Sequence, residues 1–448
     1  MKGAAVMNFE KLSEILRNSA VAGAGGAGFP TYAKLNKNAD TIILNCAECE
    51  PLLKLHRQVL ENYAFEILSA LTIIADATQA KDIIIAIKAS YEEALEAVKA
   101  ELYSFPKVKI KLLPEIYPAG DEVVTIYETT KRVVQPGNIP ISVGVIVFNV
   151  ETVLNVYNAI TDAKAVTYKY VTVAGEVNNP ITVKVPLGTS FKELINLAGG
   201  AKIQKFALLC GGPMTGKITS PLDTVTKTTN AVLVLPQDHY IIQKRLGRVS
   251  SDMKRAMSAC CQCRMCTDLC PRNLLGHPIE PHNFMRLATS GDTKEIAPFL
   301  NTMFCSNCGL CEMYSCMQNL SPRTLISQYK DGLKKNGIGI PKDVLADQIS
   351  KTRDYKKVPM SRLTARLGLT RYNVPAPLKD ELFDAKKVKI MLSQHIGAPA
   401  TPIVKKGDKV TCGQLIGNYT ADKLGIGVHA SIDGVVTDVN DKYITIKK

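Results

Sequence analysis

The sequence predicts a multidomain protein of combined α/β and α+β class. Its 448 residues exceed what a single hydrophobic core usually serves, so several folded units are expected. The first third alternates short apolar strands with helices, whereas the last 60 residues alternate short strands with turns. Two cysteine runs stand between these parts, surrounded by helical sequence. These changes of pattern separate an α/β unit, a small mixed unit, a helical cysteine region and a β unit.

The first 165 residues predict a parallel α/β domain. Helices are expected over 8–19, 59–77 and 91–102, and buried strands over 41–44, 82–87 and 108–112. Strands that alternate with helices are typical of a parallel sheet, because each crossover must be long enough to return the chain to the same edge. A glycine-rich turn over 22–31 separates the first helix from the first strand.

The remaining units are shorter. A hairpin is expected around Asn178-Asn179-Pro180, followed by a helix over 190–197 and strands over 206–209 and 231–235. The cysteine region should form helices around two ligand loops. At the C-terminal end, turns at Lys406-Gly407-Asp408 and Asp433-Gly434 predict a small β-barrel or sandwich.

The two cysteine runs carry the strongest chemical information. They read Cys260-x2-Cys263-x2-Cys266-x3-Cys270-Pro271 and Cys305-x2-Cys308-x2-Cys311-x4-Cys316. The first has the spacing of bacterial ferredoxins, in which the fourth cysteine ligates the other 4Fe-4S cluster. We therefore expect one cluster on a first cysteine set and another on a second cysteine set. The first set is Cys260, Cys263, Cys266 and Cys316, and the second set is Cys305, Cys308, Cys311 and Cys270.

A zinc-stabilised binding module is a remote alternative. Structural zinc usually takes two separated C-x2-C pairs, whereas here three ligands fall within seven residues, twice. Disulfides fit less well, since the count of 13 cysteines is odd and no secretory signal is recognisable at the N-terminus. The pattern favours a reducing compartment and single-electron chemistry.

The net charge of +14 has a local component. Residues 351–387 carry ten Lys or Arg against four Asp or Glu, which suggests either a docking surface for an acidic protein or a solvated basic linker. No helix-turn-helix, zinc-finger or RNA-recognition pattern supports a nucleic-acid partner. No apolar run is long enough to span a bilayer, so we expect a protein that does not cross a membrane.

Four segments together resemble a known flavin site. They are Gly25-Gly26-Ala27-Gly28-Phe29-Pro30-Thr31 with Lys34, Asn45-Cys46-Ala47-Glu48-Cys49-Glu50-Pro51, Gly120-Asp121-Glu122, and Asn149-Val150-Glu151-Thr152. The glycine spacing matches neither the G-x-G-x-x-G nor the Walker A pattern. In order and spacing the set resembles the FMN-binding segments of the flavin subunit of respiratory complex I and of the Rnf electron-transport C-subunit (RnfC) family.

This resemblance implies a Rossmann-like FMN domain and assigns site residues. The glycine loop, with Gly25, Gly26 and Gly28, would cradle the FMN phosphate and ribityl chain. Lys34, Asn45, Glu48 and Asn149 would contact the flavin, and Glu50 and Glu122 would lie near NADH. Cys46 and Cys49 depart from the complex I pattern. We expect two small buried residues there and not a redox pair.

The resemblance continues along the chain. Gly211 to Gly216 resembles the end of a β-grasp (SLBB) domain, and Ser393 to Pro399 resembles part of a barrel-sandwich hybrid domain. The C-terminal place of that domain, the longer second cysteine run and the segment from Arg362 to Leu369 are similar to PduS-type cobalamin reductases. The implied domains are FMN/NADH-binding 1–165, SLBB 166–245, double 4Fe-4S 246–345, a basic linker 346–388 and barrel-sandwich hybrid 389–448.

The expected activity is that of an NADH-dependent flavo-iron-sulfur reductase. Electrons would pass from NADH through FMN and two 4Fe-4S clusters to an acceptor, with a corrinoid as the leading candidate. The alternative is an Rnf-like adaptor that feeds a separate reductase or membrane complex. No separate catalytic acid or base is expected. The resemblance implies a cytoplasmic protein, with a bacterial microcompartment as a more specific location.

Overall fold

The computed structural model describes residues 7–448. The N-terminal domain is built on a four-stranded parallel sheet of order β3-β2-β1-β5. Its strands are β1 (Thr41–Cys46), β2 (Asp82–Lys88), β3 (Val108–Leu113) and β5 (Val145–Asn149). Its main helices are α1 (Phe9–Asn18), α3 (Leu55–Asn62), α4 (Ala64–Thr78), α5 (Glu92–Glu101), α6 (Glu122–Thr130) and α7 (Val150–Thr161). The predicted parallel α/β fold is confirmed.

One element of this domain differs from the expectation. The helix predicted over 59–77 is two helices, α3 and α4, which meet at Tyr63. The backbone of Tyr63 leaves the helical region, with φ −133° and ψ 35°, so the chain turns there. Periodicity alone did not reveal the break, because apolar residues of both helices enter the same core.

The second domain is a six-stranded sheet of order β12-β7-β6-β10-β8-β9. Its consecutive strands are β6 (Tyr168–Gly175), β7 (Ile181–Pro186), β8 (Phe206–Cys210), β9 (Lys217–Thr219) and β10 (Ala231–Pro236). The predicted hairpin is β6 and β7, which pair antiparallel. The predicted helix is α8 (Phe191–Leu197), which begins with a capping box between Ser190 and Glu193.

The segment predicted as a basic linker is not a free linker. It supplies β12 (Leu378–Leu382), the edge strand of the second domain, and β11 (Val358–Pro359), which pairs with β4 (Ile116–Tyr117) of the N-terminal domain. Between them lies α15 (Met360–Arg366). Its basic residues also hold it in place: the guanidinium of Arg353 lies 2.7 Å from Glu128, and the ammonium of Lys357 lies 2.9 Å from the same carboxylate.

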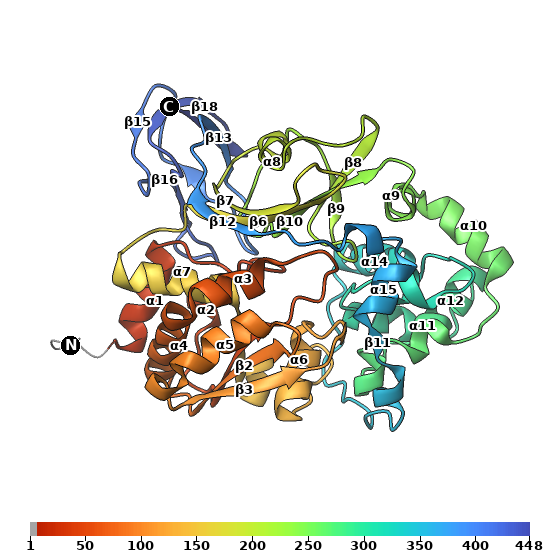
Figure 1. Ribbon diagram of the computed structural model, residues 1–448. Helices are drawn as coiled ribbons and strands as arrows, with labels where there is room; N and C mark the ends of the chain where they lie inside the picture. The colour runs from red at the N-terminus through yellow and green to blue at the C-terminus, as the bar shows by residue number, and fades with distance from the viewer. Residues whose placement is uncertain (1–6) are drawn as a thin grey trace.

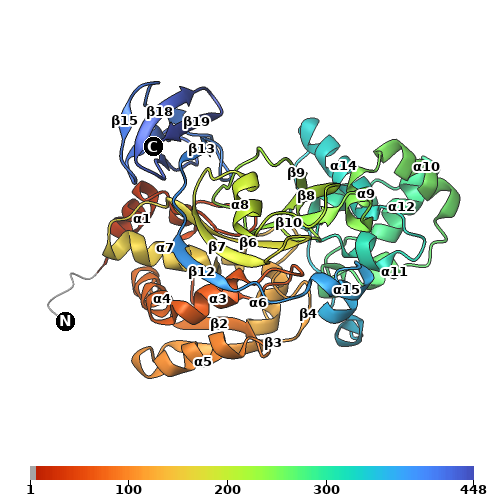
Figure 2. The same ribbon diagram turned by 45° about the horizontal axis from the view of Figure 1, so that its top comes forward.

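The cysteine region is helical, as predicted. Its helices are α9 (Tyr240–Leu246), α10 (Val249–Ala259), α11 (Met265–Asp268), α12 (Pro281–Ser290), α13 (Ala297–Leu300) and α14 (Pro322–Lys335). They pack around a small core in which Phe284 contacts Phe299 and Tyr329 edge to face. Figures 1 and 2 show this region at the edge of the molecule away from the helices of the N-terminal domain.

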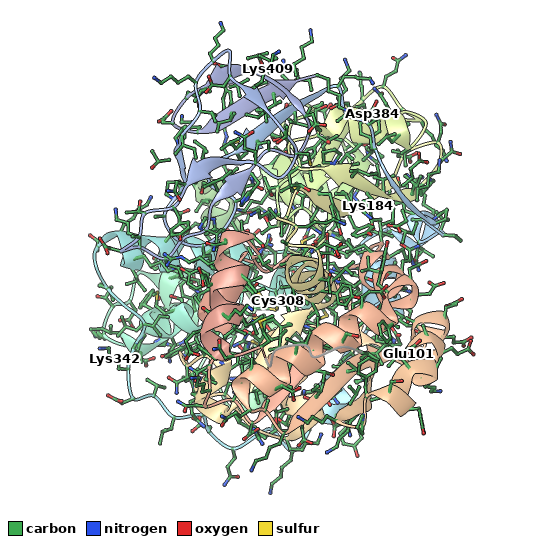
Figure 3. The ribbon with its side chains drawn as sticks, turned by 90° about the vertical axis from the view of Figure 1, so that its left-hand side faces the viewer. Glu101, Lys184, Cys308, Lys342, Asp384 and Lys409 are labelled. Atoms are coloured by element: carbon green, nitrogen blue, oxygen red, sulfur yellow. The ribbon has the colours of Figure 1, made fainter. Side chains whose placement is uncertain are left out.

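The C-terminal module is a β structure of two small sheets. One has the order β13-β19-β18-β15 and the other β14-β16-β17. The strands are β13 (Lys387–Met391), β14 (Thr401–Pro402), β15 (Lys409–Val410), β16 (Leu415–Asn418), β17 (Val428–His429), β18 (Gly434–Val439) and β19 (Tyr443–Lys447). In Figure 3, Lys409 marks this module at one end of the molecule and Glu101 lies on the N-terminal domain.

Two further facts place the functional parts. The C-terminal module packs on the N-terminal domain through a small apolar cluster of Ala20, Ala22 and Ile426. This contact brings the end of the chain against the glycine-rich loop. Within residues 7–448, no helix combines the length and the apolar character that crossing a bilayer requires.

Candidate functional site

A cavity of about 420 Å³ lies between the N-terminal domain and the second domain. All nine residues assigned to FMN and NADH from the sequence line it: Gly25, Gly26, Gly28, Lys34, Asn45, Glu48, Glu50, Glu122 and Asn149. The cavity sits at the carboxyl ends of β1 and β5, where Asn45 and Asn149 are paired in register. The strand order reverses between these two strands, which is where open α/β sheets bind ligands.

The glycine-rich loop forms one wall of the cavity. The backbone N–H of Ala24 donates to Thr152 Oγ1 at 2.8 Å, and that of Gly23 donates to the carbonyl of Phe29 at 2.9 Å, so both ends of the loop are fixed. Between them, the N–H groups of Gly25, Gly26 and Ala27 make no hydrogen bond within residues 7–448. Free backbone donors in a glycine loop are suited to a phosphate.

Two glycines of this loop are required for different reasons. Gly26 has φ +70° and open space where a Cβ would stand, so a side chain there would occupy the cavity. Gly28 has φ +71°, and a Cβ would stand 2.8 Å from the methyl of Thr228 and 3.2 Å from the carbonyl of Gln394. Gly28 therefore permits the second domain and the C-terminal module to pack on the loop.

The two asparagines at the strand ends organise the cavity floor. Asn149 accepts a hydrogen bond from the N–H of Glu151 and so caps α7, and its Nδ2 lies 2.8 Å from His56 Nε2. Asn45 donates to the carbonyl of Gly120 at 2.9 Å and accepts from the N–H of Ala47 at 3.0 Å. Both amides thus join separate loops around the cavity.

Glu48 is a buried carboxylate in the cavity wall. It accepts from the backbone N–H of His56 at 3.0 Å and from Arg57 Nε at 3.4 Å. Burial alone would raise the pKa of Glu48, but His56, Arg57 and their N–H groups outweigh it and lower the pKa. Because burial lowers the pKa of His56 to about 4, Arg57 is the neighbouring charge at neutral pH.

Glu50 is held by the second domain. Its carboxylate accepts from the N–H groups of Met214 and Thr215, each at 2.8 Å, and from the hydroxyl of Thr215. A Cβ at Gly212 would stand 2.2 Å from a carboxylate oxygen of Glu50, so glycine is needed there. The Gly211 to Gly216 loop singled out from the sequence therefore closes on Glu50.

Lys34 and Glu122 form an ion pair of 3.0 Å in the lining of the cavity. Their side chains are 29% and 40% exposed, so both groups remain accessible from solvent. The ammonium of Lys34 also lies 5.9 Å from the ring centre of Phe148. This part of the lining offers one cation and one anion to a bound ligand.

The cavity fits a flavin nucleotide by its residues as well as its volume. The side-chain oxygen of Asn230, in the lining, is buried and has no hydrogen-bond partner within residues 7–448. A polar ligand edge would satisfy it. Asn230, His56 and Thr152 were not predicted. Asn230 comes from another domain, and the Thr152 and His56 contacts depend on loop packing that no spacing rule describes.

The four residues of the first cysteine set lie together in the structure. Cys260, Cys263, Cys266 and Cys316 line one small pocket, although Cys316 is 50 positions from Cys266 in the printed sequence. Burial raises the pKa of Cys266 to about 12, and the neighbouring thiols of Cys316, Cys260 and Cys263 add to the rise. Among residues 7–448, no three metal-binding side chains meet at one point as a single ion requires.

The second cysteine set also converges. Burial raises the pKa of Cys308, and the thiols of Cys270 and Cys305 add to the rise. The same causes act on Cys311, whose neighbours are Cys305, Cys308 and then Cys266 of the first set. Each set thus draws its fourth thiol from the other run, and the two sets are neighbours.

The two ligand loops share one backbone pattern. The residues before and after the second cysteine have positive φ in both loops: Gln262 and Arg264 in the first, Asn307 and Gly309 in the second. Donors also reach the sulfurs, since Gln262 Nε2 lies 3.2 Å from Cys260 Sγ and the N–H of Asn307 lies 3.4 Å from Cys305 Sγ. Such N–H···S contacts are expected around cluster thiolates.

The extra residue of the second run has a structural explanation. Residues Cys311–Ser315 form a π-helical turn, whereas Met265–Asp268 of the first run are α-helical. A π-turn is the usual result of inserting one residue into a helix. The π-turn accommodates the inserted residue, and Cys316 still lies in one pocket with Cys260, Cys263 and Cys266.

Cys46 is buried, as predicted, whereas Cys49 is only half-buried. Cys46 is buried in the core, and burial raises its pKa. Cys49 lines the cavity, and burial raises its pKa to about 12, with Glu50 adding to the rise. Thiols with raised pKa values stay protonated at neutral pH and are poor nucleophiles.

The cavity and the second cysteine set share an apolar cluster. Tyr117 packs there with Met214 and Leu310, and both Cys49 and Cys308 border it. On one side the partly buried ion pair between Arg272 and Asp121, 2.9 Å long, joins the residue after Cys270-Pro271 to the N-cap of α6. These contacts hold the second cysteine set beside the flavin cavity.

Comparisons with known families agree with this arrangement. Residues 16–158 match the Nuo51 FMN-binding domain, 170–217 the SLBB domain, 259–321 the 4Fe-4S dicluster domain and 378–448 the RnfC barrel sandwich hybrid domain. The predictions of FMN and two 4Fe-4S clusters are confirmed, and the dicluster match supports clusters over zinc.

Individual proteins resemble the whole chain or a large part of it. The cobalamin reductases PduS of Citrobacter freundii and Salmonella typhimurium are each 39% identical over 98% of this chain and over 96% and 97% of their own lengths. A component of the ion-translocating oxidoreductase complex of Edwardsiella ictaluri is 32% identical over 59% of this chain and 32% of its own.

One solved structure shares the fold. An NAD+-reducing NiFe hydrogenase in the H2-reduced state aligns with a TM-score of 0.51 at 18% identity. The alignment covers 76% of this chain and 64% of the hydrogenase chain, so the present chain spans less than two thirds of that protein. At this identity the likeness concerns the fold alone.

Proposed function

Because the chain belongs to the family of the cobalamin reductase PduS and is a flavin and iron–sulfur oxidoreductase, we propose that it carries electrons from NADH to a corrinoid. The observation that carries the proposal is the adjacency of the flavin cavity and the second cysteine set, which border one apolar cluster around Tyr117. When bound, FMN accepts two electrons together, and the 4Fe-4S clusters pass them on singly.

The chain's own residues bind and orient. The free N–H groups of Gly25, Gly26 and Ala27 would hold the FMN phosphate, with Asn149 and Asn45 shaping the floor beneath the flavin. These assignments rest on the family resemblance and on the shared cavity. No acid or base catalyst is needed, since the protein places the cofactors and tunes their potentials.

Glu50 and Glu122 would lie near the nicotinamide nucleotide. Glu122 is accessible from solvent, although its carboxylate forms an ion pair with Lys34. Glu50 is bonded to the N–H groups of Met214 and Thr215, so its contribution is to hold the second domain against the mouth of the cavity. Nucleotide binding would therefore be sensitive to the fit between the two domains.

The reaction balances with two acceptors per donor. One NADH gives up two electrons and becomes NAD+ with release of one proton. Each cob(III)alamin takes one electron and becomes cob(II)alamin, so two corrinoids are reduced for each NADH. We place this reaction in the bacterial cytoplasm, or more specifically in a microcompartment, on the strength of the resemblance to PduS.

The test is anaerobic mixing of the fully loaded protein with NADH and cob(III)alamin. We expect NADH-dependent formation of cob(II)alamin with a stoichiometry near two per NADH, and a loss of the reaction in protein freed of FMN or of the clusters. Reduction of artificial dyes with cobalamin left untouched would refute the proposal and favour an adaptor that feeds a separate reductase.

A further inference from the structure

The first cysteine set opens to the surface, whereas the second is enclosed. Cys263 of the first set is exposed, as is the adjacent Cys261, while Cys311 of the second set is buried. The second set borders the apolar cluster at the flavin cavity, and the turn that begins at Cys311 packs against α11, which holds Cys266. The first set therefore lies beyond the second as seen from the cavity, near α10 at the edge of the molecule (Figures 1 and 2).

The surface around the first set is basic. Residues 248–264 contain four basic side chains, Arg248, Lys254, Arg255 and Arg264, and all four are exposed. None of them takes part in an ion pair within the described part of the chain. The one acidic residue of the stretch, Asp252, is buried with 7% exposure. The positive charge here is thus not neutralised by the protein itself.

Apolar side chains and a groove accompany these charges. Met257 and Met317 are 62% and 68% exposed. A groove of about 280 Å³ runs beside α10, and Gln318 and Leu320 line both this groove and the pocket of the first set. We define the α10 face by residues that line the pocket and groove, Lys254, Arg255, Arg264, Met317 and Gln318, together with the exposed Met257 of α10.

We propose that the α10 face is the docking surface for an acidic redox protein, which receives single electrons from the first cluster. The proposal rests on the proposed function in requiring that electrons leave the chain. Unpaired cations attract a partner whose redox centre is ringed by carboxylates. Exposed methionines adapt to a partner surface, and electron-transfer encounters bury small interfaces.

The structure favours this surface over the basic linker. Arg353, Lys356 and Lys357 of that segment are paired with Glu128 and Asp268, and they fasten the segment to the other domains.

The size of the groove favours a protein over a free corrinoid as the occupant of the α10 face. Small-molecule sites enclose most of their ligand, whereas the groove of about 280 Å³ is smaller than the usual range even for drug-sized ligands.

The test uses two haem proteins as probe acceptors, the acidic cytochrome b5 and the basic cytochrome c. Loaded protein is reduced with NADH, and the rate of haem reduction is followed at low and high salt. We expect the reduction of cytochrome b5 to slow about tenfold or more in the variant Lys254→Glu/Arg255→Glu and to lose most of its salt dependence. Cytochrome c should show no such loss.

The matched control is Lys192→Glu/Lys387→Glu, which makes the same charge change on exposed residues of a different groove. Its rate with cytochrome b5 should stay within about twofold of the unchanged protein. As a readout independent of electron flow, carbodiimide cross-linking without NADH should join Lys254 to carboxylates of cytochrome b5. The milder pair Lys254→Gln/Arg255→Gln guards against misfolding and should give a smaller loss in the same direction.

Three results would overturn the docking proposal. One is an unchanged cytochrome b5 rate in the charge-reversed variant. The second is an equal loss in the control variant, which would mean a general charge effect. The third is an equal loss with free cobalamin, which would make the face a small-molecule site. Failure of the unchanged protein to reduce cobalamin, with the cytochrome b5 pattern intact, would instead refute the corrinoid assignment and leave the docking surface standing.

Discussion

The hydroxyl of Tyr117 donates a hydrogen bond to the backbone carbonyl of Cys308 across the boundary between the N-terminal domain and the cysteine region. Tyr117 is 3% exposed and packs in the apolar cluster that Cys49 of the cavity wall also borders. Tyr117 thus lies in the apolar cluster beside the cavity and also contacts Cys308 of the second cysteine set. This contact fixes their separation, on which electron exchange between the two depends.

Replacing Tyr117 by Phe should remove that hydrogen bond and keep the packing. We expect the free energy of unfolding to fall by about 1 kcal/mol, since the part-buried carbonyl of Cys308 loses this donor. The electron paramagnetic resonance spectrum of the second cluster should change while that of the first stays the same. Tyr168→Phe, which loses a contact with Asn158 far from the cysteines, is the control. Equal spectral effects of both variants would argue against a special role for Tyr117.

Replacing Cys270 by Ala should damage the cluster on Cys305, Cys308 and Cys311, although Cys270 belongs to the first run. Anaerobically prepared protein should drop from about eight irons to about four, with the first cluster retained. Iron analysis and resonance spectra measure this directly. Cys261→Ala, which changes an exposed cysteine of the same run, should keep both clusters. Loss of only the first cluster in Cys270→Ala would show that the fourth ligands are not exchanged.

Replacing Gly26 by Val should empty the cavity of FMN and leave both clusters in place. The side chain would enter the ligand space, and the positive φ adds backbone strain. Gly291→Val is the matched control, because Gly291 has φ +69° and no neighbour within 4 Å, and it lies outside the cavity. Flavin content after gel filtration decides between them. Full retention in Gly26→Val would place the cofactor elsewhere.

The family resemblance and the cysteine spacing pointed to residues that the structure gathers in the cavity and in the pocket of the first cysteine set. The resemblance to FMN-binding segments grouped Asn45 with Asn149, and the structure pairs them in register at the ends of β1 and β5. The exchange of Cys270 and Cys316 followed from the ferredoxin pattern. Local chemistry and strand topology constrain where such residues lie, so order and spacing along the chain carry information about the site.

What could not be predicted depends on contacts between domains. Asn230 lines the cavity only because the second domain packs on the first. The same packing lets the backbone N–H of Met214 donate to the carboxylate of Glu50. The strand β12 is short and charged, so its sequence resembles that of a linker. It is a strand because it pairs with β7 of the second domain. Likewise, the length of the second cysteine run gave the position of an insertion but not its π-helical form.

Stability should fall as the pH drops from about 6.5 to about 4. Four histidines, His56, His277, His395 and His429, have their pKa values lowered to about 4, with burial as the largest cause. The unfolded chain takes up protons near pH 6.5, whereas the folded chain resists them, so unfolding is favoured within this window. For the fully buried His56 the full effect is about 3 kcal/mol.

Thermal unfolding against pH for the unchanged protein and for His56→Gln measures this contribution. The variant should lose less stability between pH 6.5 and 4 than the unchanged protein does, because one group no longer resists protonation. If the stabilities of the two proteins fell in parallel over that range, His56 would titrate normally in the folded protein. The imidazole at the cavity floor would then not be held neutral by burial.

The most direct test of the account is whether electrons from NADH reach the clusters only when the cavity holds FMN. Anaerobic NADH is added to the unchanged protein and to flavin-free Gly26→Val, and the reduction of both clusters is followed by electron paramagnetic resonance. We expect NADH to reduce the clusters of the unchanged protein, and the variant's clusters to be reduced by dithionite but not by NADH. Equal reduction by NADH in both proteins would contradict it.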